Sequence, residues 1–226
     1  MALNMEFPGD FNQLELLQTH CHLIPRGTTG PWNEEEEEEE NKEEHTEEWY
    51  LQEECRMQET CCPADFMLWA AENNRLSVVP RLLSLDSSLI GCCDSDGYTA
   101  LHRASYEGHA GMVQVLMDAG AELEARTADG WTPLHCACRW DKVAVASCLL
   151  WAGALVNSHS HGKVTPLHLA AGNAGAGKTL ELMLMHRQLQ AGLCNNSGET
   201  AYTIACRSSK HFHLFEITDA CNTVST

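Results

Sequence analysis

Basic side chains are scarce in this sequence. Lys and Arg total 14 against 32 Asp and Glu, which gives a formal net charge of −18. Most of the imbalance lies at the start of the chain, because residues 1–64 hold 17 acidic and 3 basic side chains, a net −14, whereas residues 65–226 have a net −4. Phosphate backbones repel a chain this acidic, which argues against direct nucleic-acid binding.

The sequence also lacks an apolar run long enough to span a bilayer. Its start, MALNMEFPGD, has no basic segment followed by an apolar stretch, so we expect no signal peptide. Twelve cysteines are present, but adjacent pairs such as Cys61-Cys62 and Cys92-Cys93 do not form a disulfide framework. We therefore expect a reducing compartment, the nucleus or the cytosol, in which these thiols stay reduced.

Residues 1–64 are predicted to form an acidic, largely disordered arm with short apolar motifs. Seven consecutive glutamates, Glu34 to Glu40, cannot be buried and repel one another. Apolar segments at 11–24 and 47–54 flank this run, and each can become a short helix when it docks. Two interpretations remain open: these segments cap the folded region, or they are linear motifs that bind a partner.

A tetrapeptide recurs at a fixed interval in the rest of the chain. Thr-Pro-Leu-His occurs at 132–135 and 165–168, and a near copy, Thr-Ala-Leu-His, at 99–102, each 33 residues from the next. Three copies at this interval are typical of ankyrin repeats, which the chain resembles. The predicted fold is therefore all-α, an ankyrin-repeat solenoid of helix-turn-helix units over residues 65–221. About five units fit this range, with degenerate terminal ones, and residues 222–226 form a tail.

Each unit carries the local signals of a helix pair. A turn containing glycine opens the unit, because glycine adopts positive φ at little cost. Thr then caps the first helix, Pro occupies its first turn, and the His three residues after Thr can bond the Thr hydroxyl. The second helix has an apolar stripe and ends at another glycine. The glycines expected in these roles are Gly97, Gly130, Gly162 and Gly198 in the turns, and Gly120 and Gly153 after the second helices.

The segments outside the repeats narrow the resemblance. FNQLELLQTHCHLIPRG at 11–27, the glutamate run and EEWYLQEE at 47–54, followed by this repeat set, resemble one branch of the ankyrin-repeat family. That resemblance implies a non-enzymatic protein that is mainly nuclear, promotes transcription and has a role in germ-cell differentiation. Cytoplasmic residence is also compatible with it.

Ankyrin repeats usually bind other proteins, so the leading hypothesis is a protein-interaction adaptor that regulates transcription. Its expected partner lies on the concave face, and a second partner could bind the acidic arm, which resembles an activation segment. We expect no direct nucleic acid, membrane or small-molecule substrate. The alternative is a cytosolic ankyrin scaffold or inhibitor without a transcriptional role.

The candidate partner-binding surface is aromatic and basic. Tyr, Trp and Arg dominate the residues that contribute most to protein interfaces. Tyr98 and Trp131 occupy the same repeat position, and the alternative for both is that they brace neighbouring turns. The predicted partner-binding residues are Tyr98, Tyr106, Trp131, Arg139 and Trp140.

One motif suggests an enzyme. Residues 172–179, GNAGAGKT, match the phosphate-binding expression GxxxxGK[ST]. That loop needs a buried strand before it, whereas residues 165–171 are predicted to be the first helix of a repeat. A nucleotide-binding enzyme through 172–179 therefore stays a remote alternative, and the simpler interpretation is a lengthened turn between paired helices.

Metal binding is not favoured either. His20-Cys21-His22, Cys136-x-Cys138 and His159-x-His161 all lack the two-pair spacing of a structural zinc site. Cys136, Cys148 and Cys206 are expected to act as small buried apolar side chains. We accordingly predict no cofactor, no metal and no catalytic residue.

Overall fold

The computed structural model describes residues 46–60 and 62–216. The chain divides into two units, residues 1–45 and residues 46–226, and everything below concerns the second unit. The glutamate run, the apolar segment 11–24 and the tail 222–226 lie outside the described residues.

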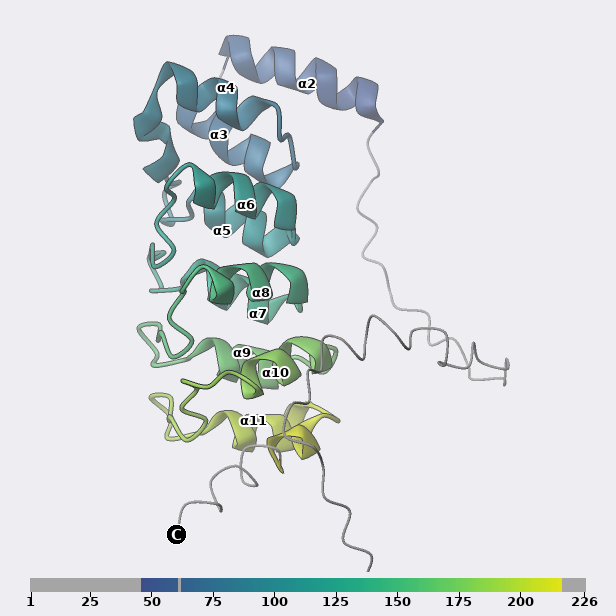
Figure 1. The fold of residues 1–226 in the computed structure, drawn as a ribbon, viewed down its shortest axis with the longest axis vertical. Coiled ribbons are helices and arrows are strands. Elements are labelled where there is room, and N and C mark those ends of the chain that lie inside the picture. The colour runs from purple at the N-terminus through teal and green to yellow at the C-terminus, as the bar shows by residue number, and fades with distance from the viewer. Residues whose placement is uncertain (1–45, 61, 217–226) are drawn as a thin grey trace, which may run out of the picture. The chain divides into compact units, whose positions relative to one another are not determined.

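Paired helices stack in chain order through this unit (Figure 1). Helix α2 (Glu47–Thr60) precedes the pairs, and the 3₁₀ helix η1 (Ser87–Gly91) follows the first pair. Helix α11 (Ala201–Ser208) is followed by the 3₁₀ helix η2 (Phe212–Phe215), the last element up to residue 216. The pairs are α3 (Pro63–Glu72) with α4 (Val78–Leu85), α5 (Ala100–Glu107) with α6 (Ala110–Asp118), α7 (Pro133–Arg139) with α8 (Val143–Trp151), and α9 (Pro166–Gly172) with α10 (Gly177–Leu184). The all-α ankyrin solenoid predicted from the repeat interval is confirmed.

The core lies between successive units, as expected when no single pair can bury its own apolar face. The first helices pack in the order α3, α5, α7, α9 and α11, and the second helices α6, α8 and α10 pack side by side. Leu101, Leu134 and Leu167 occupy equivalent positions of three units and are almost fully buried. Each regular repeat therefore depends on its neighbours for stability.

The first helices begin where the Thr residues predict. Thr99, Thr132 and Thr165 have extended backbone at the N-cap, with ψ of 170°, 166° and 164°. Pro133 and Pro166 occupy the first turn of α7 and α9, where a missing N–H breaks no helical hydrogen bond. The repeated sequence thus specifies both the start and the direction of each first helix.

The turns between units follow the glycine pattern with one exception. Gly97, Gly130 and Gly198 have φ of 81°, 79° and 74°. In the third turn the residue with positive φ is Lys163, at 54°, so the prediction for Gly162 is wrong. Position 163 lies 33 residues after Gly130, the same interval that separates Gly97 from Gly130. The positive φ therefore recurs at this interval, although the residue there is Lys and not Gly.

Helix α2 contacts the first repeat. Arg75 forms ion pairs with Glu47 at 2.8 Å and Glu54 at 3.7 Å, and its guanidinium lies 5.6 Å from the centre of the Tyr50 ring. Met57 packs against the core cluster. These contacts agree with the capping interpretation of segment 47–54, although the boundary between an arm at 1–64 and a repeat domain at 65–221 stays a prediction.

Candidate functional site

Three histidines tie the repeat units together. Each accepts a hydrogen bond at Nδ1 from the backbone N–H of the Thr three residues before it, at 3.1–3.2 Å. Its Nε2–H then donates to a backbone carbonyl of the next unit. The carbonyls of Trp131, Val164 and Glu199 lie 3.0, 3.0 and 3.2 Å from Nε2 of His102, His135 and His168, respectively.

These bonds require neutral imidazoles. Burial lowers the pKa of His102 and of His135 to about 4, and it also lowers the pKa of His168. Nδ1 must stay unprotonated in these bonds, and the ring stays neutral even below pH 6. Such an imidazole is poorly suited to general acid–base catalysis near neutral pH. The three histidines therefore hold the scaffold of the site in position.

The ends of the first helices form an aromatic cluster, which we call the Tyr106–Trp140 cluster and define as Tyr106, Arg139 and Trp140. The Tyr106 and Trp140 rings lie 4.9 Å apart between centres, although they belong to neighbouring units. The Arg139 guanidinium lies 5.1 Å from the centre of the Trp140 ring. Tyr106 is 39% exposed and Trp140 is 38% exposed, so both rings keep accessible surface for a partner.

The cluster rests on a hydrogen-bonded support. The side-chain amide of Asn173, at the end of α9, donates to the carbonyl of Arg139 at 2.9 Å. Lys142, which precedes α8, packs its aliphatic chain over Gly108 of the preceding pair. The φ of Gly108 is 91°. A rigid backbone under exposed aromatic rings lowers the conformational entropy lost on binding.

Tyr98 lies in a second group, at the turn before α5. Arg103 places its guanidinium 5.4 Å from the centre of the Tyr98 ring and donates to the Asp94 carboxylate at 2.6 Å. Burial alone would raise the pKa of Asp94, but the Tyr98 N–H and the Arg103 guanidinium lower it. Arg103, which sequence reasoning left out of the site, thus links the turn to α5.

Trp131 lies at the equivalent turn of the next unit. Its ring stacks on His135 with 6.3 Å between centres, and its backbone N–H donates to the Thr127 hydroxyl at 3.1 Å. Its carbonyl accepts the hydrogen bond from His102. These contacts favour the bracing role for Trp131.

Of the five predicted partner-binding residues, the structure brings Tyr106, Arg139 and Trp140 into one cluster. Tyr98 and Trp131 each lie beside the histidine of their own unit. Sequence reasoning missed Trp151, at the end of α8, which is 90% exposed. The sequence could have indicated this residue, because α8 reads VAVASCLLW and its Trp lies outside the stripe of buried residues, where it has no packing role.

The loop at 172–179 is built unlike a phosphate-binding loop. It follows helix α9 rather than a strand, and Thr179, which would bind magnesium in such a loop, is fully buried with its hydroxyl donating to Asp141. The Gly175 and Ala176 N–H groups bond Asn173, at 2.9 and 3.2 Å. This arrangement supports the lengthened-turn interpretation.

The cysteines divide between core and surface. Cys136 and Cys138 are fully buried, and burial raises the pKa of the Cys136 thiol to about 12 and that of Cys138 further. Cys148 is half-buried, whereas Cys206 is exposed, so its predicted burial is wrong. Cys206 lies on α11, and in the part of the chain that the structure describes no further helix pair packs over this helix. Within the described residues, no group of three or more His, Cys, Asp or Glu is placed to hold a metal ion.

Comparison with known proteins identifies the family. Residues 66–160 match the model for ankyrin repeats in three copies. Ankyrin repeat domain-containing protein 49 of Homo sapiens is 56% identical over 222 residues, which cover 98% of this chain and 92% of the human protein. The chain belongs to the ankyrin-repeat family.

Other members of the family are similar over all or part of the chain. The Mus musculus protein of this name is 53% identical over the same share of both chains. The Drosophila melanogaster protein is 53% identical over 150 residues, 66% of this chain and 70% of its own length. The chain is therefore an ankyrin-repeat protein that resembles these relatives along nearly its whole length, and the family is typically non-catalytic, with repeats that imply a protein-binding scaffold. In the described part of the chain, no helix has the length and apolar character needed to cross a membrane.

Proposed function

We propose that this protein is a non-enzymatic interaction adaptor that promotes transcription in the nucleus, with a role in germ-cell differentiation. The observation that carries the binding function is the Tyr106–Trp140 cluster, in which two half-exposed aromatic rings from different units lie 4.9 Å apart beside an arginine. The transcriptional and germ-cell roles are supported by the resemblance of segments 11–27 and 47–54 together with the similarity across 98% of the chain.

The partner on the repeats is a protein that offers aromatic or apolar side chains to the cluster. Arg139 lies beside the Trp140 ring and Arg103 beside the Tyr98 ring, and the net charge of −18 of the whole chain favours a partner with a basic rim. Tyr98 and Trp131 extend the contact along the turns. Together the five residues span two neighbouring units, as a face of stacked repeats requires.

The acidic arm supplies a second binding region. Its net charge of −14 over residues 1–64 is interspersed with apolar residues, a composition typical of activation segments. One protein would then hold a partner on the repeats and recruit another through the arm.

A cytosolic scaffold or inhibitor is the alternative. It requires the same binding surface but no transcriptional partner. Nuclear and cytosolic fractionation of cells that express the full chain separates the two, since a protein confined to the cytosol contradicts the nuclear proposal and leaves the binding surface unaffected.

The binding surface is tested by proximity labelling with the full chain, followed by affinity measurements with the purified partner. The double variant Tyr106→Ala/Trp140→Ala should weaken the complex at least tenfold, because hot-spot residues contribute about 2 kcal/mol or more and 1.4 kcal/mol is a factor of ten. Tyr202→Ala, an aromatic on the last helix, is the control.

Circular dichroism and thermal melting accompany the affinity measurement. Both variants should keep the helical signal of wild type, because Tyr106, Trp140 and Tyr202 are exposed. A folded double variant that binds its partner as tightly as wild type would make the acidic arm the leading candidate for the binding region.

A further inference from the structure

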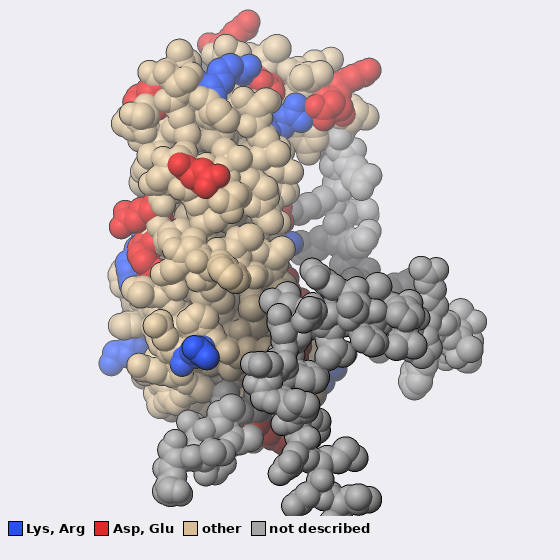
Figure 2. Space-filling model, viewed as in Figure 1, with Lys and Arg blue, Asp and Glu red and all other residues tan. Residues whose placement is uncertain are grey.

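The second helices form a face with little charge. Helix α8 contains no charged residue and α6 contains only Asp118, whereas α10 contains an exposed Lys178 and an exposed Glu181. Figure 2 shows this side of the molecule, where charged side chains are sparse around the middle. Exposed faces of helices in a solenoid usually carry charged residues, so the absence of charge along α8 needs an explanation.

Trp151 dominates this face. It is 90% exposed, and Met185 on the neighbouring unit is 65% exposed. Leu155, four residues after Trp151, is 60% exposed. Several large apolar side chains gathered on one side of a monomer mark an interaction site more often than chance exposure does.

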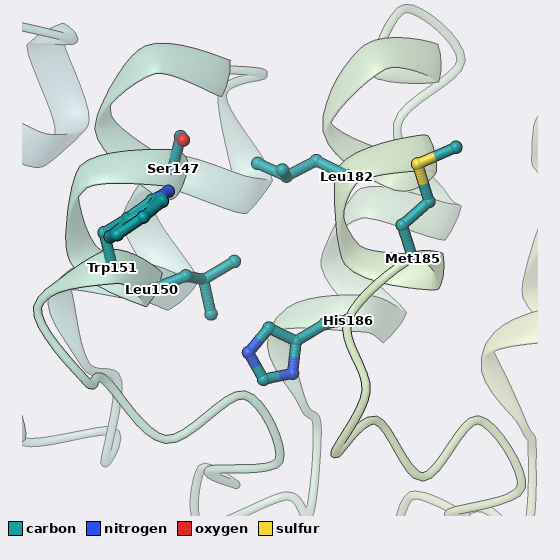
Figure 3. A pocket seen from close by; sticks show the side chains of 6 residues that line it. All are labelled: Ser147, Leu150, Trp151, Leu182, Met185 and His186. Atoms are coloured by element: carbon teal, nitrogen blue, oxygen red, sulfur yellow. The ribbon is translucent and has the colours of Figure 1, made fainter. Parts of the chain in front are cut away.

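Two hollows flank Trp151. The hollow between α8 and the end of α10 has a volume of about 370 Å³, and Leu182 and His186 point across it toward α8 (Figure 3). The hollow between α6 and α8 has a volume of about 390 Å³ and contains the Asp118 carboxylate in its wall. Ser147 and Trp151 line both, so the indole stands as a ridge between two recesses.

We propose that this face, the α6–α8–α10 face, binds the apolar side of a basic amphipathic helix from a partner protein. The recesses accept aliphatic side chains on both sides of the Trp151 ring, as when a helix lays its apolar stripe into a groove. A Lys or Arg at the edge of that stripe reaches Asp118, which is exposed and accepts a hydrogen bond from the Gln114 side-chain amide at 2.9 Å.

Charge selects a basic helix over other occupants. Residues 65–226, which form the repeats, have a net charge of −4, and Asp118 is exposed on this face, so an acidic helix is repelled while it approaches and a basic one is attracted. A second copy of the chain brings the same net charge and is disfavoured for that reason. The surface is also separate from the Tyr106–Trp140 cluster, since it belongs to the second helices, and it stands whether or not that cluster binds a partner.

The test uses the full chain and a fluorescein-labelled Leu/Lys peptide of about four helical turns, with Leu along one face. A peptide of the same composition in scrambled order is the control for attraction to the acidic arm, because it keeps the charge and loses the apolar stripe. Fluorescence anisotropy at physiological ionic strength measures both affinities for wild type, Trp151→Ala, Asp118→Asn and the matched control Trp49→Ala.

We expect Trp151→Ala to weaken binding of the amphipathic peptide at least tenfold, Asp118→Asn to weaken it severalfold, and Trp49→Ala to leave it within twofold of wild type. The scrambled peptide should bind all four proteins alike. Equal affinity of wild type and Trp151→Ala for the amphipathic peptide would overturn the proposal. So would a Trp151-dependent dimer in sedimentation velocity, which would assign the face to a second copy of the chain. Because Trp151 is almost fully exposed, the variant keeps the wild-type melting curve.

Discussion

At the scale of single residues, one imidazole per unit performs two structural tasks. Its Nδ1 accepts the N–H that opens its own helix, and its Nε2–H donates to the next unit at 3.0–3.2 Å. The first task fails when the ring gains a second proton, because a protonated Nδ1 can no longer accept the Thr N–H, whereas Nε2–H still donates. The stability of the stack is therefore linked to pH through buried residues.

The unfolding free energy should fall as pH decreases from about 6.5 to about 4. In the folded state the pKa of His102 and His135 is about 4, whereas the unfolded value is 6.5, so the unfolded chain takes up protons first. The stability is complete above pH 6.5 and is lost down to pH 4, by up to about 3 kcal/mol for each histidine at 1.36 kcal/mol per pKa unit.

Urea unfolding across this pH range measures the effect. His135→Gln should be less stable at neutral pH and should show a shallower dependence between pH 6.5 and pH 4. A variant with the same slope as wild type would show that the pH dependence comes from other groups, such as the carboxylate of Asp94.

Lys163→Gly should stabilise the protein by about 1 kcal/mol. Lys163 has φ of 54°, and a left-handed backbone costs a residue with a Cβ about 1–2 kcal/mol, part of which is offset by the greater freedom of glycine in the unfolded chain. Asn74→Gly, at φ of 55°, is the matched control and should gain less, because Asn tolerates this conformation. Denaturant midpoints at constant m-value would report the difference, and no gain at position 163 would contradict the strain argument.

At the scale of helices, the first helices and α2 are stabilised by different contacts. The first helices are specified by the Thr cap and the following His, whereas α2 is held by side chains of another element. Arg75 of the first unit contacts Glu47, Glu54 and the Tyr50 ring of α2. Helix α2 is therefore the element most readily released without unfolding the stack.

Arg75→Ala should increase transient release of α2. A cation–π contact at an exposed site contributes about 0.5–1 kcal/mol, so its loss raises the opening equilibrium about two- to fivefold. Hydrogen exchange of amides within residues 47–60 should speed up by that factor, while amides of α5 and α7 stay unchanged. Arg56→Ala serves as the control, because Arg56 pairs with Glu53 of α2 itself. Faster exchange in the control to the same extent would argue against a tether through Arg75.

Lys178→Ala should change neither stability nor nucleotide binding. Lys178 is exposed in the first turn of α10, and substitutions at such positions stay within about 0.5 kcal/mol. Titration calorimetry with ATP or GTP in the presence of magnesium checks binding. Saturable binding by wild type that disappears in the variant would reinstate the nucleotide-binding alternative for residues 172–179.

At the scale of the whole molecule, stability is shared along the stack. The core cluster runs without a break from α3 to η2, and its members come from every pair. Repeat arrays of this kind gain most of their stability from contacts between neighbours. The two ends of the described stack differ: α2 contacts the first pair, whereas within residues 62–216 α11 is followed by a 3₁₀ helix alone.

A chain truncated to begin at Thr60 should still unfold cooperatively. The core cluster lies in α3 to η2, with Met57 of α2 only partly buried against it. A half-buried Met contributes about 1 kcal/mol, so the truncated chain should melt about 2–4 °C below one that begins at Thr46. Calorimetry measures both. A molten or aggregating product would place the domain boundary before α2 and reject the predicted one at residue 65.

The sequence by itself determined the repeat fold of this protein, because its signals are local and recur every 33 residues: Thr caps, Pro in the first turn, and glycines at 97, 130 and 198. It also located the aromatic residues at the helix ends. It could not determine which side chains meet across units. The 4.9 Å approach of Tyr106 to Trp140, the histidine bonds to the next unit, the positive φ of Lys163 and the two hollows beside Trp151 are decided by the tertiary structure. The physical reason is that these contacts depend on the rise and rotation between stacked helix pairs, which no short stretch of sequence encodes.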